Sequence, residues 1–87
     1  MAKLNDFKQY DTVYLKRAFT AEVTYYTSQF HVDLFNKEPY FLAIIENTNV
    51  RTVDDEKRYY CFIPLLNCFY EFGENTECFK EEPNNKK

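Results

Sequence analysis

The residues best suited to catalysis are Ser28, His31 and Asp33, and His31 is the only histidine of the chain. A hydroxyl nucleophile needs a base within hydrogen-bond reach and a carboxylate that orients this base. On an extended strand, His31 and Asp33 would lie on one face. A His-x-Asp pair on an outward face is far more often a solvated surface pair, and no glycine-bearing turn nearby offers an oxyanion site. We therefore predict no catalytic residue and no enzyme activity.

Cysteine is the second reactive residue type, at Cys61, Cys68 and Cys78. The odd number, the lack of a CxxC pair and the single histidine argue against a zinc site. Cys61 and Cys68 lie among aromatic and aliphatic residues, which predicts buried, unreactive thiols. Acidic residues near Cys78 disfavour its thiolate. We expect no metal, no cofactor and a reducing cytoplasmic setting, which is the host cytoplasm if the chain is phage-encoded.

Three acidic residues are consecutive at Asp54, Asp55 and Glu56. A calcium loop alternates its ligands around a central glycine, and this segment has neither feature. The better interpretation is the solvated tip of a β-hairpin. Its carboxylates would also suit contact with a basic partner, because opposite charges accelerate association.

Aromatic residues are the strongest feature, with nine Phe and eight Tyr among 87 residues. Tyrosine is enriched in binding hot spots because it offers a large rigid ring and one hydroxyl group. Alternation places several rings outward, so they contact either a partner or a second layer of a closed barrel. The predicted partner-binding residues are Tyr14, Tyr26, Phe35, Tyr40 and Tyr59, together with Asp54, Asp55 and Glu56. Phe69 is a further ring that alternation places outward.

The elements that must position these residues are short strands, because apolar and polar residues alternate with a period of two. Strands are predicted over residues 11–16, 19–26, 30–35, 40–45, 50–53, 58–63, 66–72 and 77–80. The run 40–45 is apolar on both faces, which is typical of a central strand covered on two sides. Residues 46–49 are expected to turn the chain, and Gly73 is expected to adopt a positive φ. Spacing of three among apolar residues in 1–10 predicts one or two helical turns.

This pattern predicts an all-β fold, a small curled antiparallel sheet or barrel with a short N-terminal helical turn. We expect one domain over residues 1–80 and a disordered C-terminal tail over 81–87. The segment Phe62-Ile63-Pro64-Leu65, followed by a strand at 68–72, resembles the corner that joins the last two strands of SH3-like and Sm-like barrels. The resemblance covers this corner only and assigns no functional residue.

Charge restricts the classes of partner. The net charge of -3 and the pI near 5.1 give no overall attraction to nucleic acid or to an anionic membrane. No apolar stretch follows Met1, so neither a signal peptide nor a membrane-spanning helix is expected. A single-stranded oligonucleotide-binding barrel is the first alternative, because rings and basic side chains can interleave along a binding strip. That strip would consist of Tyr14, Lys16, Arg17, Arg58 and Tyr59.

The function predicted from these residues is a non-enzymatic protein-binding module. Residue types specified by AT-rich codons are abundant, which favours a phage or mobile-element protein of a low-GC host. Such a protein would bind a host protein and inhibit or adapt it, as an anti-defence inhibitor does. The second alternative is a structural or virion accessory subunit that forms homo-oligomers through edge strands or exposed rings.

Overall fold

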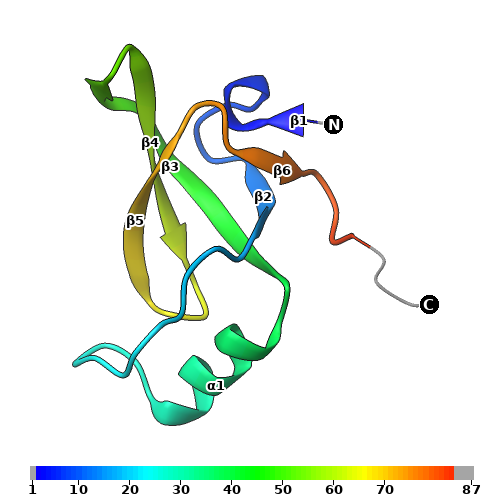
Figure 1. Cartoon of the computed structure of the whole chain (residues 1–87), viewed down its shortest axis with the longest axis vertical. Coiled ribbons are helices and arrows are strands. Elements are labelled where there is room, and N and C mark those ends of the chain that lie inside the picture. Colours follow the sequence, from blue (N-terminus) through cyan, green and yellow to red (C-terminus); the bar gives the residue numbers. More distant parts are fainter. Residues whose placement is uncertain (1, 84–87) are drawn as a thin grey trace.

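The computed structural model describes residues 2–83, and its main feature is one six-stranded sheet with the strand order β1-β6-β2-β3-β4-β5 (Figure 1). All of its strand pairs are antiparallel. The elements are β1 (Ala2–Lys3), the 3-10 helix η1 (Leu4–Asp6), β2 (Thr12–Lys16), α1 (Gln29–Lys37), β3 (Tyr40–Val53), β4 (Glu56–Ile63), β5 (Cys68–Gly73) and β6 (Glu77–Phe79). The all-β prediction and the N-terminal helical turn are confirmed. Residues 84–87 of the predicted tail lie outside the described part.

The sheet curls without closing into a barrel. Among the described residues, β1 lies at one end of the strand order and β5 at the other, and the two do not pair. The strand predicted at 77–80 forms as β6 and lies between β1 and β2. Of the two architectures that the sequence predicts, the structure has the curled sheet and not the closed SH3-like barrel.

The central strand β3 joins the two halves of the sheet. Its first part pairs with β2, with Val13 opposite Ala43 and Leu15 opposite Phe41. Its later part pairs with β4, and the register shifts between Ile45 and Asn47 and again before Arg51. The predicted turn at 46–49 is wrong, because these irregularities let the strand bend and continue where a chain reversal was expected.

The β3–β4 hairpin ends in a two-residue turn at Asp54 and Asp55. Both residues have positive φ, 53° and 65°. Two successive positive φ values are typical of a type I′ turn, whose twist matches that of the flanking strands. The predicted acidic tip is therefore confirmed for these two aspartates.

Gly73 does not have the predicted positive φ. Its missing side chain matters for another reason, since a Cβ at this position would overlap the carboxylate of Glu56. That carboxylate also accepts a hydrogen bond from the backbone N–H of Asn75, at 3.2 Å. A larger residue at position 73 would therefore have to displace the end of the Glu56 side chain.

The predicted strand at 30–35 is wrong, because this segment is part of helix α1. Ser28 caps the helix by accepting a hydrogen bond from the backbone N–H of His31. Val32 and Phe35 are buried, at the i, i+3 spacing of one helix face. The helix ends before Pro39, and Glu38 has the extended conformation that a following proline favours.

The predicted strand at 19–26 is also wrong, because no strand forms between Arg17 and Ser28. Asn36 of α1 fixes this segment by accepting from the N–H of Ala21 at 2.8 Å and donating to its C=O at 3.0 Å. Thr24 and Thr27 then close a turn through their hydroxyl groups. The Asn36 side chain therefore satisfies the backbone N–H and C=O of Ala21, which a neighbouring strand would otherwise have bonded.

The core lies on one side of the sheet, which we call the inner face. It contains Val13, Leu15, Phe41, Ala43, Ile45, Cys61 and Ile63, all buried. Phe35 of α1 and Phe19 of the loop pack on this face. The centroids of their rings lie 5.0 Å and 6.3 Å, respectively, from that of Phe41. Figure 1 shows α1 at the opposite end of the molecule from the β3–β4 hairpin tip.

Candidate docking surface

Two of the predicted contact residues are buried, so the prediction that they face a partner is wrong. Phe35 has 0% of its surface exposed because it lies on the inward side of a helix. Tyr59 is 6% exposed, and burial, followed by the charge of Glu74, raises the pKa of its hydroxyl. Alternation in β4 places Tyr59 with Cys61 and Ile63 on the inner face.

The opposite side of the sheet, which we call the outer face, is also apolar. Strand register aligns its side chains in two adjacent rows across the sheet. One row is Phe79, Tyr14 and Leu42, and the next is Ile44, Phe62 and Phe69. Tyr40 and Tyr60 extend these rows at residue spacings of two along their strands. The outer face is therefore defined as Tyr14, Tyr40, Leu42, Ile44, Tyr60, Phe62, Phe69 and Phe79.

No side chain of the outer face is fully buried. Phe69 is 45% exposed and Tyr60 is 38% exposed, and their rings stack at 5.0 Å with an interplanar angle of 10°. At the other end, Tyr40 meets Phe79 edge to face at 5.4 Å. These contacts hold large rings in fixed positions, so their burial by a partner costs little side-chain entropy.

A charged cluster borders the outer face near the hairpin. Arg51 Nε donates to Glu71 Oε1 at 3.0 Å, and Arg58 Nε lies 3.8 Å from the same oxygen. Arg58 also lies 3.9 Å from Glu56. The Nε atom of Arg58 is buried and has no hydrogen-bond partner within residues 2–83. The cluster forms a polar border with nearly balanced charge, as in the rim of a protein interface.

Two hollows lie beside one another at the α1 end of the outer face. One, of about 460 Å³, is lined by Tyr14, Tyr40 and Leu42. The other, of about 360 Å³, is lined by Tyr25 and Tyr26. His31, Pro64 and Leu65 line both hollows and form the wall between them. Three predicted contact residues, Tyr14, Tyr40 and Tyr26, are thus brought into one region.

The acidic residues are not part of that region. Asp54 and Asp55 are exposed at the hairpin tip, at the opposite end of the molecule from α1 (Figure 1). Glu56 is half-buried and turned back over Gly73. The predicted contact residues that are exposed therefore lie at two opposite ends of the folded molecule.

The Ser28–His31 pair is a helix cap. Ser28 Oγ lies 2.7 Å from His31 Nδ1 and also accepts from the His31 backbone N–H at 3.3 Å. Asp33 accepts from Gln29 Nε2 at 2.7 Å, so its carboxylate is engaged away from the imidazole. The structure brings the hydroxyl to the imidazole without an orienting carboxylate.

The cysteines are free thiols on the inner side of the fold. Burial raises the pKa of Cys61 to about 12, with a smaller effect of Cys78. Burial also raises the pKa of Cys78 to about 11, followed by the charges of Asp6 and Glu77. Cys68 is half-buried, and burial raises its pKa as well. These directions disfavour the reactive thiolate form.

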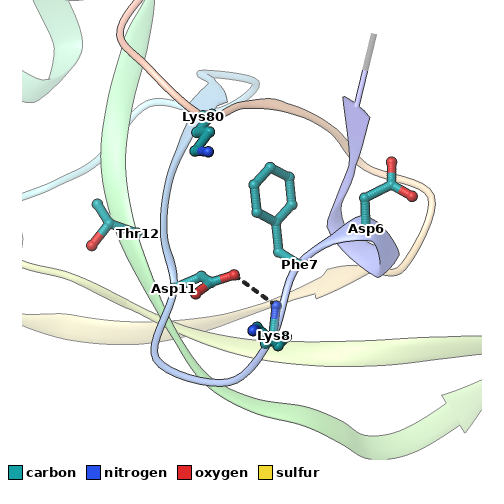
Figure 2. A pocket seen from close by; sticks show the side chains of 6 residues that line it. All are labelled: Asp6, Phe7, Lys8, Asp11, Thr12 and Lys80. Atoms are coloured by element: carbon teal, nitrogen blue, oxygen red, sulfur yellow. Dashed lines mark hydrogen bonds between the residues drawn. The ribbon is translucent and has the colours of Figure 1, made fainter.

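Figure 2 shows a third hollow, of about 650 Å³, near the N-terminus. The Phe7 ring stands between the charged side chains of Asp6, Asp11 and Lys80 (Figure 2). The carboxylate of Asp11 is engaged, since it accepts from the backbone N–H of Lys8 at 2.9 Å. The Lys8–Asp11 hydrogen bond closes a turn at this hollow, and the hollow is lined by charges of both signs. These side chains do not point together as the ligands of a bound ion would (Figure 2).

The predicted nucleic-acid strip does not form as one surface. Tyr59 is buried, and Arg58 lies between two carboxylates. Arg17 donates to the backbone C=O groups of Glu38 and Phe19, at 2.9 Å and 3.1 Å. Its guanidinium therefore fixes the loop before α1.

Sequence reasoning missed Leu42, Ile44, Tyr60, Phe62 and Phe79 as surface residues. The signal was the run Tyr40–Ile45, which is apolar at every position. This run predicts a strand covered on both sides, whereas Leu42 and Ile44 are only partly buried. An uncovered apolar side gives the same sequence pattern as a covered one.

No protein-family profile, curated protein or solved structure matches this chain. In the described range, none of the helices has the length and apolar character needed to cross a bilayer.

Proposed function

We propose that this chain is a protein-binding module that docks its outer face on a protein partner. The supporting observation is the pair of apolar rows that crosses β6, β2, β3, β4 and β5 with no fully buried side chain. These side chains are partly exposed and contiguous, and contiguous apolar surface that remains accessible marks interaction sites in proteins. An aromatic centre with a charged border has the composition of a protein interface.

The partner would present an apolar patch of matching extent. The two positive charges of Arg51 and Arg58 are balanced by the negative charges of Glu71 and Glu56, so this border favours no strongly charged partner. The exposed carboxylates of Asp54 and Asp55 lie at the hairpin tip, where they would affect the rate of approach to a basic surface more than the contact itself. A host protein bound by a phage or mobile-element product in a reducing cytoplasm remains part of this proposal, and the free thiols are consistent with such a compartment.

The test compares two double variants that each remove two exposed or half-exposed rings. Tyr14→Ser with Tyr60→Ser changes the outer face. Tyr10→Ser with Phe30→Ser removes rings that are 67% and 68% exposed elsewhere. The immobilised wild-type chain captures proteins from host lysate, which mass spectrometry identifies. The best captured protein is then titrated against each variant.

We expect the outer-face variant to lose about tenfold or more in affinity, because two hot-spot rings are removed. The control variant should bind as the wild type does, and circular dichroism should show that both are folded. Equal losses in the two variants, or full affinity in the outer-face variant, would remove the outer face as the docking surface.

A further inference from the structure

The two edges of the sheet differ in how they are protected. The β1 edge is two residues long and is followed at once by η1. The β5 edge is six residues long and contains no proline and no lysine. Proteins usually protect edge strands by shortness, proline, charge or a covering segment. At β5 the only charged residue, Glu71, is paired with Arg51 of the same chain.

The alternation of hydrogen-bonded and non-hydrogen-bonded residue pairs between β4 and β5 shows which backbone groups of β5 face the free edge. Arg58 lies opposite Gly73, and the N–H of Glu74 donates to the C=O of Lys57 at 2.8 Å. In an antiparallel ladder, hydrogen-bonded and non-hydrogen-bonded pairs alternate. The N–H and C=O groups of Tyr70 and Phe72 therefore point to β4. Those of Phe69 and Glu71 point to the free edge.

These free groups have no other partner in the described range. No hydrogen bond joins the backbone of Phe69 or Glu71 to a segment outside the β4–β5 ladder. Exposed rings flank them on both sides of the sheet, with Phe69 45% and Tyr70 37% exposed. The edge thus offers paired donors and acceptors between two apolar surfaces, which is what strand addition requires.

We propose that two copies of this chain associate by antiparallel pairing of β5 with β5, about a two-fold axis at Tyr70. Two-fold pairing centred on a residue places inner side chains opposite inner ones and outer opposite outer. In this register, Phe69 of each copy lies opposite Glu71 of the other, and the two residues exchange both backbone hydrogen bonds.

Charge favours this register over the one with the two-fold axis at Glu71. A two-fold axis at Glu71 would place the two Glu71 carboxylates directly opposite each other, which is unfavourable. With the axis at Tyr70, each Phe69 ring faces the other copy's Glu71, which is bound to Arg51. A guanidinium held beside an aromatic ring adds a cation–π attraction. The edge is therefore complementary to itself.

The dimer would combine the two six-stranded sheets into one continuous sheet. Their outer faces would become adjacent and double the apolar area available to a partner. This inference goes beyond the proposed function and does not depend on it, because it concerns the backbone edge and not the outer-face residues Tyr14 and Tyr60.

Sedimentation equilibrium over a concentration series tests the proposal with two variants at one position. Phe69→Pro removes an N–H that points away from β4, so the β4–β5 ladder remains intact. Phe69→Ala removes the same ring but keeps the N–H. We expect a reversible monomer–dimer equilibrium for the wild type, with dimerisation of Phe69→Pro weaker than that of Phe69→Ala by about tenfold or more.

Amide hydrogen exchange gives a second test that needs no variant. The amides of Phe69 and Glu71 should become more protected as protein concentration rises. The amides of Tyr70 and Phe72 serve as internal controls and should be protected at every concentration. A wild-type chain that stays monomeric, or Phe69 and Glu71 amides that exchange equally fast at all concentrations, would overturn the proposal. Equal dimerisation of the two variants would do the same.

Discussion

The inner and outer faces of the sheet contain similar apolar side chains, but those of the inner face are buried and those of the outer face remain partly exposed. Inner residues such as Phe41, Ile45 and Ile63 are nearly or fully buried, and the rings of Phe35 in α1 and Phe19 in the loop before it pack on Phe41. Outer residues such as Ile44 and Phe62 occupy adjacent positions on the same strands and are only partly buried. The difference shows that apolar alternation alone does not specify burial, because a face becomes core only where another segment covers it.

Stability should depend mainly on the inner face. We expect Phe35→Ala to destabilise the fold by about 3–5 kcal/mol, because a fully buried ring leaves a cavity among Phe19 and Phe41. The matched change on the outer face, Phe62→Ala, should cost about 1–2 kcal/mol, since this ring is partly exposed and contacts Phe69. Urea unfolding measures both variants. Equal losses would show that the outer face is as much a part of the core.

The inner thiols should make stability decrease in alkaline solution. The folded pKa of Cys61 is raised from 9.0 to about 12. Above pH 9 the unfolded thiol therefore loses its proton first, and the unfolded state binds fewer protons than the folded state. The free energy of unfolding then falls as pH rises from about 9 towards about 12. Below pH 9 this contribution is fully present.

Cys61→Ala is the control for this effect. Unfolding measured at several pH values should show a shallower alkaline decrease in the variant than in the wild type. Identical slopes would indicate that Cys61 is accessible to water in the folded chain, which would contradict its place on the inner face.

The hairpin tip belongs to neither face, and its change should have the smallest effect. Asp55 adopts a φ of 65°, which is unfavourable for a residue with a Cβ. We expect Asp55→Gly to stabilise the chain by about 0.5–1 kcal/mol, because glycine is preferred at this position of a type I′ turn. Thermal unfolding measures the change. A loss of stability would mean that the aspartate side chain supports the turn.

The sequence allowed accurate prediction where local signals agreed with the tertiary structure. The strands at 11–16, 58–63 and 66–72 have a period of two and form as β2, β4 and β5, with β2 paired to β3 and β4 paired to β5. The acidic hairpin tip was also predictable, since its flanking residues alternate. These elements needed no knowledge of distant contacts.

Other elements depended on contacts between residues far apart in the chain. Residues 30–35 alternate as a strand does, yet Ser28 caps a helix and Asn36 binds the backbone of Ala21. The Ser28 cap is local, but the Ala21–Asn36 bonds join residues 15 positions apart and form only when the loop folds back on α1. The outer face could be predicted as apolar but not as uncovered, because coverage depends on where α1 packs. The prediction for Phe35 is wrong because a helix forms where a strand is expected, and the prediction for Tyr59 is wrong because Tyr59 shares the buried side of β4 with Cys61 and Ile63.

The most direct test of the docking surface is methyl NMR of the labelled chain with the captured protein added. Leu42 and Ile44 report on the outer face, and Ile45 and Ile63 report on the inner face. The docking proposal predicts shifted or broadened signals for Leu42 and Ile44, with Ile45 and Ile63 nearly unchanged. Binding that leaves Leu42 and Ile44 unperturbed would contradict it.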